Sequence, residues 1–197
     1  MSLATHTPPP GESSAETCAE CARLRGCEAC FEELVRRFQS PLLHFLIRRT
    51  GSRHDAEDVL QETFLVAYRN IARYRASWRF STWLFTIANN AAASAWRRKR
   101  RPAAGGPRPV ERVCNIDPLA DAQEKELHST LWDAVRGILE PDAFTALWLS
   151  YVESMSAEEI GRVLGRSANA ARILLHRARA RLATELESFS ETPNEKR

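Results

Sequence analysis

The stretch SAEEIGRVLGRSANAARILLHRARARL, residues 156–182, decides the fold of the C-terminal half of this 197-residue chain. Ser156 and Glu159 have the spacing of a capping box, in which two side chains satisfy free amides at the start of a helix. Gly165 is suited to end that short helix, because glycine readily takes the left-handed conformation found after many helices. Ser167 can cap a second, longer helix. The pattern therefore predicts a helix-turn-helix.

The second helix of this motif combines an apolar face with a basic one. Leu174, Leu175, Ala178 and Leu182 would be buried, while the opposite face offers side chains that reach base edges and phosphates in a DNA groove. We expect DNA contacts from Arg166, Ser167, Asn169, Arg172, His176 and Arg177. The alternative is an amphipathic helix of a bundle that binds no ligand.

Apolar residues at helical spacing also mark the N-terminal half. They predict a helix from Phe31 to Gly51, with a kink or a brief break at Pro41, and a second helix from about Asp55 to Ile71. A third would begin near Ser81, its expected cap, and end in the basic run 97–101.

Proline and glycine exclude regular structure in residues 102–122, and no strand pattern is visible. The predicted fold is all-α, with two small helical domains joined by a flexible linker. The expected divisions are a disordered tail with cysteines (1–21), a first domain (22–101), the linker (102–122), the helix-turn-helix domain (123–188) and a tail (189–197).

Composition limits the classes of function. Hydrophobic residues make up 44% of the chain and charged residues 27%, as in ordinary globular proteins. No apolar run reaches the roughly 18 residues of a membrane span, and the N-terminus lacks a secretion signal, so we expect a cytoplasmic protein without membrane insertion. No nucleophile–base set or phosphate-binding glycine loop points to an enzyme.

The net charge of +3 is unevenly distributed. Residues 63–110 and 160–184 contain no acid, although both stretches are rich in arginine. Two separated basic surfaces predict two contacts with a polyanion. Solvated arginine-rich faces remain the alternative.

Aromatic and basic side chains are mixed just before the third predicted helix. Trp78 and Phe80 lie beside Arg75 and Arg79, a combination that can stack on unpaired bases and attract their phosphates. Trp83 is at helical spacing and is more simply explained as a core residue.

Four acids stand within about two turns of the second predicted helix: Asp55, Glu57, Asp58 and Glu62. Like charges at this spacing repel one another. A cationic partner surface would relieve the repulsion, so this face is a candidate protein-docking site. An acidic face in contact only with solvent is the alternative.

Four cysteines near the N-terminus form two C-x-x-C pairs, Cys18 with Cys21 and Cys27 with Cys30. They are candidates for a four-thiolate zinc site or a redox switch, although the five residues between the pairs are fewer than in a zinc ribbon. Otherwise Cys27 and Cys30 are small apolar residues of a helical first turn. We expect no cofactor or metal, and we interpret Cys114, in the linker, as a free thiol.

Taken in order, these segments resemble the extracytoplasmic-function (ECF) sigma factors of the sigma-70 class over about residues 22–187. The resemblance is carried by FEELVRRF (31–38), DAEDVLQETF (55–64), STWLFTIA (81–88) and LHRARARL (175–182). It implies a first domain that binds core RNA polymerase and opens the minus-ten element, a linker that follows the RNA exit path, and a second domain that recognises the minus-thirty-five element.

By this resemblance, residues 58–61 match the core-binding pattern and residues 73–80 match the loop that recognises a flipped minus-ten base, with help from Asn90. The expected core-binding residues are Asp55, Glu57, Asp58, Gln61 and Glu62. The expected minus-ten residues are Arg75, Trp78, Arg79, Phe80, Asn90 and Arg97. NAARIL (169–174) departs from the usual recognition helix, because Ile173 and Leu174 replace polar or cationic residues, which suggests an altered promoter preference.

The resulting prediction is an ECF sigma factor that acts by binding alone, with core polymerase, promoter DNA and an anti-sigma factor as partners. Two alternatives remain open. One is a stand-alone helix-turn-helix regulator that does not need polymerase. The other is a zinc- or redox-responsive module built on the N-terminal cysteines, with DNA binding secondary.

Overall fold

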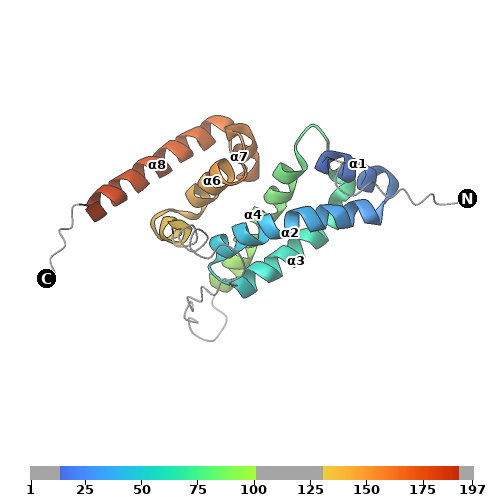
Figure 1. Cartoon of the computed structure of the whole chain (residues 1–197), viewed down its shortest axis with the longest axis horizontal. Coiled ribbons are helices and arrows are strands. Elements are labelled where there is room, and N and C mark those ends of the chain that lie inside the picture. The colour runs from blue at the N-terminus through green and yellow to red at the C-terminus, as the bar shows by residue number, and fades with distance from the viewer. Residues whose placement is uncertain (1–13, 101–130, 191–197) are drawn as a thin grey trace, which may run out of the picture. The chain divides into compact units, whose positions relative to one another are not determined.

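A computed structural model describes residues 14–100 and 131–190, and all regular secondary structure in these two ranges is helical. The chain divides into two units, Met1–Val113 and Cys114–Arg197, and each is described by itself (Figure 1). The predicted all-α class is therefore confirmed. The predicted linker, residues 102–122, lies outside the described residues. Among the described helices, none is long and apolar enough to cross a bilayer.

Residues 14–100 of the first unit form four α-helices and one 3₁₀ turn. These are α1 (Ala15–Arg25), α2 (Glu28–Thr50), α3 (Arg53–Asn70), η1 (Ile71–Arg73) and α4 (Phe80–Arg100). α2 packs along α3 and α4, and α1 packs against α2 (Figure 1). Leu34, Phe45, Val59, Leu84 and Phe85 are almost fully buried where these helices meet. Each such side chain contributes roughly 1.5–3 kcal/mol through burial, which holds the helices together.

The N-terminal helix α1 corrects the prediction that residues 1–21 are disordered, which is wrong from Ala15 onward. Ser14 caps α1 by accepting a hydrogen bond from the Thr17 amide at 3.1 Å. Cys18, Ala19 and Ala22 are buried. Their stripe has helical spacing, but it consists of small residues, so it gave no strong periodic signal in the sequence.

Two helix boundaries also differ from expectation. α2 continues through Pro41 without a break, because buried residues on both sides of the proline keep the two halves packed on the same core. α4 begins at Phe80, so Ser81 lies inside its first turn and does not cap it. Instead, the Phe80 amide donates to a carboxylate oxygen of Glu16, at 3.2 Å, so α1 satisfies a free amide at the start of α4.

The described part of the second unit consists of helical residues 131–138, followed by α6 (Pro141–Tyr151), α7 (Ala157–Val163) and α8 (Ala168–Ser190). α8 therefore extends two residues into the predicted tail. Trp132 packs against Phe144 and Trp148, with ring centroids 5.9 and 4.9 Å apart. α7 and α8 both pack on α6 and on each other, which forms the predicted helix-turn-helix.

The signals that predicted this motif are confirmed one by one. The Ser156–Glu159 capping box is present, and the Ser167 hydroxyl accepts from the Ala170 amide at 3.2 Å. Gly165 has a φ of 64°, in the left-handed region that favours glycine. The sequence alone did not single out Gly161. A Cβ there would lie 2.8 Å from the carbonyl oxygen of Arg166, so only glycine allows α7 to approach the turn this closely.

Candidate functional site

The acidic residues of α3 divide into two groups. Asp55 and Glu62 pair with Lys99 and Arg98 at the end of α4, the second pair at 3.1 Å. Glu57 pairs with Arg53 of its own helix at 2.9 Å. Cations of the same unit therefore already relieve the repulsion that suggests a partner for these three acids, and their contact with a partner protein stays a prediction.

The rest of α3 presents an exposed stripe. We call Asp58, Gln61, Leu65 and Tyr68 the α3 stripe; all four are exposed, Leu65 by 55% and Tyr68 by 49%. Their spacing of three, four and three residues places them on one helical face. Asp58 lies 3.8 Å from His54 at an otherwise open position.

Sequence reasoning found Asp58 and Gln61 in this stripe but missed the two apolar members. Leu65 and Tyr68 line a groove between α2 and α3, together with Phe31 and Val35. The rings of Phe31 and Tyr68 meet edge to face, with centroids 5.0 Å apart. Exposed apolar surface bordered by polar residues is typical of protein-interaction sites. Extending the face of Asp58 and Gln61 by two turns along α3 would have identified both residues.

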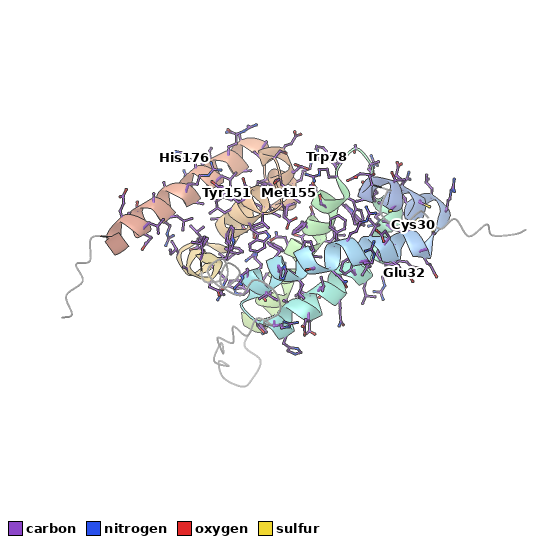
Figure 2. The ribbon with its side chains drawn as sticks, viewed as in Figure 1. Cys30, Glu32, Trp78, Tyr151, Met155 and His176 are labelled. Carbon is purple, nitrogen blue, oxygen red and sulfur yellow. The ribbon has the colours of Figure 1, made fainter. Side chains whose placement is uncertain are left out.

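The loop between η1 and α4 carries the predicted base-contacting residues. Arg75 and Arg79 are exposed, and Trp78 is half-buried on the same loop (Figure 2). The Tyr74 hydroxyl donates a hydrogen bond to the Trp78 carbonyl oxygen at 2.9 Å. Because Tyr74 itself is only 1% exposed, this bond anchors the loop to the core.

One expected minus-ten residue is placed differently. Phe80 is 1% exposed and packs against Phe38, Tyr74 and Trp83, with ring centroids 5.4–5.6 Å apart. The prediction that Phe80 stacks on a base is therefore wrong, because its ring faces are covered by the core. Asn90 and Arg97 are exposed two helical turns apart, on one face of α4.

Burial and the carboxylates of Glu16 and Glu20 raise the pKa of Tyr74 to about 12, from an ordinary value of 10.0. The phenol then stays protonated in the folded state at pH values where the unfolded chain has lost the proton. The unfolded state binds fewer protons, so the stability that Tyr74 contributes is complete below pH 10 and is lost as the pH rises toward 12.

We expect the difference in free energy of unfolding between wild type and Tyr74→Phe to shrink as the pH rises above 10. Denaturant titrations at pH 9, 10 and 11 measure it, because phenylalanine keeps the ring and removes the titrating group. A difference that stays constant from pH 9 to 11 would contradict this assignment.

The exposed face of α8 contains most of the predicted contacts for duplex DNA. Asn169, Arg172, His176 and Arg177 are exposed on this face (Figure 2 labels His176), and Ile173 lies among them with 44% of its surface exposed. The buried face consists of Ala171, Leu175 and Ala178, with Leu174 and Leu182 half-buried. Two predicted contacts have structural partners in the same unit. Arg166 pairs with Asp142 at 2.6 Å, and Ser167 caps α8.

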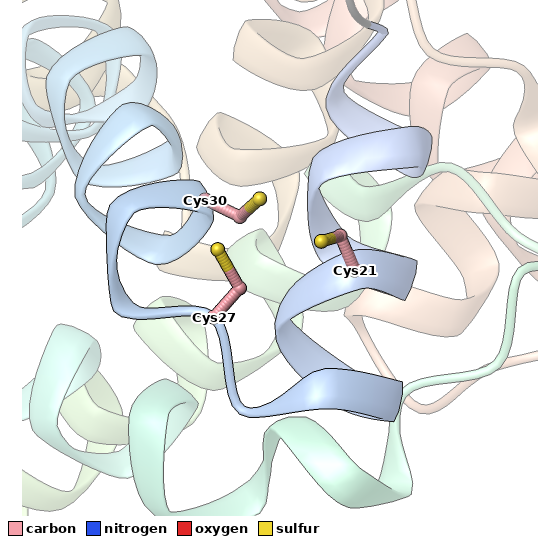
Figure 3. Close-up of side chains that lie close together, drawn as sticks. All are labelled: Cys21, Cys27 and Cys30. Atoms are coloured by element: carbon pink, nitrogen blue, oxygen red, sulfur yellow. The ribbon is translucent and has the colours of Figure 1, made fainter. Parts of the chain in front are cut away.

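Three of the four N-terminal cysteines converge. The sulfur atoms of Cys21, Cys27 and Cys30 all lie within 4.8 Å of one another (Figure 3). Hydrogen bonding with Cys30 lowers the pKa of the Cys27 thiol, whereas burial raises the pKa of the Cys30 thiol. Cys18 is fully buried and lies outside this group of three, and burial raises the pKa of its thiol.

Comparison with known proteins assigns both units to one family. The family model for sigma-70 region 2 matches residues 34–102, and a model for sigma-70 region 4 matches residues 137–182. α1 and the three converging cysteines precede the region 2 match.

Individual sigma factors are also similar to this chain. The RNA polymerase sigma factor CarQ of Myxococcus xanthus is 38% identical over 157 residues, which cover 80% of this chain and 89% of CarQ. The ECF RNA polymerase sigma factor SigW of Bacillus subtilis is 26% identical over 185 residues, or 84% of this chain and 93% of SigW. CnrH, solved in complex with the cytosolic domain of CnrY, is similar with a TM-score of 0.65 and 25% identity, over 89% of this chain and 99% of CnrH. The chain therefore belongs to the ECF sigma factors of the sigma-70 family.

Proposed function

We propose that this ECF sigma factor binds core RNA polymerase through the α3 stripe and holds promoter DNA at two surfaces, one in each unit. It would act by binding alone, in the cytoplasm with the polymerase, and would catalyse no reaction itself. The observation that carries the proposal is the presence, in one chain of this family, of an exposed acidic and apolar helix face and two exposed basic surfaces.

For core binding, the α3 stripe combines two kinds of contact. Leu65 and Tyr68 supply apolar area, and Asp58 and Gln61 supply a charge and an amide at the open end of the stripe. Interfaces of this composition gain affinity from the apolar part and orientation from the polar part. Asp55, Glu57 and Glu62 would act indirectly, because their ion pairs hold neighbouring side chains in place.

For the minus-ten element, the proposed surface joins the loop before α4 with one face of α4 itself. Trp78 offers a ring for stacking, and Arg75 and Arg79 offer charge for the phosphates. Asn90 and Arg97 would extend the surface along α4. The hydrogen bond from Tyr74 limits the motion of the loop, which lowers the entropic cost of ordering it on DNA.

For the minus-thirty-five element, the proposed surface is the exposed face of α8, presented to the major groove. Asn169 and Arg172 lie near the start of the helix, where helix-turn-helix proteins contact bases. Ile173 is exposed beside them and has no polar group, so it suits contact with the methyl group of thymine. We therefore expect a thymine within the sequence that this helix contacts.

Replacing Arg172 with alanine should weaken binding to the preferred duplex by about 1–3 kcal/mol, or roughly 5- to 150-fold, if the guanidinium contacts a base. Competition binding by holoenzyme, with single base pairs of the upstream element varied in turn, measures the loss. Arg181→Ala removes the same charge from an exposed site nine residues later on α8 and serves as the control. An equal loss on every duplex would show a phosphate contact and contradict base recognition.

The decisive test of the whole proposal is transcription in vitro. Purified chain added to core polymerase should direct initiation at defined start sites on a genomic fragment library, and core enzyme alone should not. Specific duplex binding without polymerase, together with no start-site-directed RNA from any fragment, would favour the stand-alone regulator.

Regulation by a protein partner follows from the likeness to CnrH, whose solved structure contains the cytosolic domain of CnrY. We propose that an anti-sigma factor binds this chain when it is inactive. The exposed apolar groove between α2 and α3 is a surface that such a partner could cover, in competition with polymerase.

A further inference from the structure

We propose that the thiols of Cys21, Cys27 and Cys30 bind one Zn²⁺ ion, which fastens α1 to the start of α2. This inference concerns a segment before the region 2 match and does not depend on the proposed function. The three side chains come from two helices joined by a short turn, and they point toward one another (Figure 3).

The geometry suits a shared metal ion. Zinc–sulfur bonds of about 2.3 Å in a tetrahedral site place two sulfur atoms roughly 3.8 Å apart. The three sulfurs already lie within 4.8 Å of one another, so small side-chain rotations would bring them to bonding positions. Binding requires each thiol to release its proton to solvent. A water molecule can fill the fourth position, as in zinc sites with three protein ligands.

The position of Cys27 adds a second argument. It is the N-cap residue of α2, so its side chain lies at the turn that joins α1 to α2. Its thiol lies beside those of Cys21 in α1 and Cys30 in α2, so an ion held by the three sulfur atoms would bridge the two helices at this turn.

A disulfide is the competing explanation, since Cys27 and Cys30 form a C-x-x-C pair at a helix start. The number of thiols favours metal. A disulfide between any two of the three cysteines would leave the third thiol unused, whereas a metal ion uses all three.

A zinc ion bound by the three cysteines would also affect parts of the fold that do not bind it. α1 packs on η1 as well as on α2 and α4, and its residue Glu16 accepts a hydrogen bond from the first amide of α4. An ion that fastens α1 to α2 would therefore also stabilise the start of α4 and the loop that precedes it. An isolated helix as short as α1 is only marginally stable in water, so a zinc ion that tethers α1 should measurably stabilise it.

The experiment uses the full chain, reduced and stripped of metal with a chelator, and then titrated with Zn²⁺ against a chromophoric competitor. We expect one equivalent of zinc per chain, and a cobalt(II) derivative with thiolate-to-metal absorption and tetrahedral ligand-field bands. Cys21→Ser and Cys27→Ser should each weaken binding by more than the roughly 10- to 100-fold typical of losing an outer-shell partner. Serine at position 27 is a favourable N-cap, so this variant should fold.

The matched control is Cys18→Ala, which removes a buried thiol from the same helix but not from the group of three. It should retain the zinc. As an independent readout, zinc at 100 times its Kd should slow hydrogen exchange of the α1 amides by up to about 100-fold in wild type and in Cys18→Ala only.

Three results would overturn the proposal. The first is less than stoichiometric zinc in the reduced wild-type chain, and the second is equal zinc affinity in wild type, Cys21→Ser and Cys27→Ser. The third is a Cys27–Cys30 disulfide without zinc in protein isolated anaerobically and free of reductant, which would show a redox pair instead. Loss of zinc from Cys18→Ala would also contradict the assignment of ligands.

Discussion

Asp58→Lys combined with Gln61→Ala should abolish co-purification of this chain with core RNA polymerase. Both side chains are exposed at the polar end of the α3 stripe, so the substitutions disturb no core packing. Lysine at position 58 would remove the attraction between Asp58 and a cationic surface of the polymerase, and it would add repulsion. Disrupting one charged contact in a desolvated interface costs about 2–5 kcal/mol, so Kd should rise at least about 30-fold.

The apolar half of the stripe gives a second, independent variant. Leu65→Ala with Tyr68→Ala should weaken core binding as well, because these residues supply most of the exposed apolar area of the stripe. Fluorescence anisotropy with labelled chain and purified core measures both Kd values, and helical content by circular dichroism checks that the variants fold.

The matched control for the charge reversal is Glu158→Lys. Glu158 is exposed in the first turn of α7, in the second unit, and it is not part of the α3 stripe. Its replacement by lysine changes the net charge by two, as Asp58→Lys does. If Glu158→Lys weakens core binding as much as the change at Asp58 and Gln61, overall charge is responsible and the docking assignment is wrong.

The helix-turn-helix could be predicted almost in full from sequence because its signals are local. The capping box, the left-handed glycine and the Ser167 cap each depend on residues within four positions of one another, and each is present. The close approach at Gly161 could not be predicted, because it depends on where the next turn passes in space.

The first unit was less predictable because its helices and ion pairs depend on contacts between residues far apart in the sequence. α1 depends on burial against α2 and α4 more than on a strong periodic pattern. Asp55 and Glu62 pair with cations 44 and 36 residues away, so the sequence around the two acids does not reveal these partners. The convergence of three cysteines likewise required the turn between α1 and α2 to be known.

Phe80 illustrates how an aromatic residue at a loop boundary is ambiguous in sequence. Trp78 and Phe80 are two residues apart and both border basic side chains, so composition alone treats them alike. The structure separates them, because Phe80 joins the rings of Phe38, Tyr74 and Trp83 in the core, while Trp78 remains half-buried on the loop.

Phe80→Ala should therefore destabilise the first unit by about 3–5 kcal/mol, the usual cost of truncating a buried phenylalanine. For a unit of this size, the melting temperature should fall by more than about 10 °C. Thermal unfolding followed by circular dichroism measures this shift. Phe80→Leu retains apolar volume and should lose clearly less stability, which separates a packing role from a general sensitivity of the position.

Trp78→Ala should show the opposite pattern, with a stability loss of about 1 kcal/mol or less and a selective loss of promoter opening. If its ring stacks on an unpaired minus-ten base, holoenzyme should bind a fork-junction template about 1–3 kcal/mol more weakly, while binding to the upstream duplex alone is unchanged. Two results would reverse the assignments: normal stability of Phe80→Ala with impaired fork binding, or unimpaired fork binding by Trp78→Ala. Because one variant reports on packing and the other on base contact, the pair tests whether the boundary between core and DNA surface runs between these two residues.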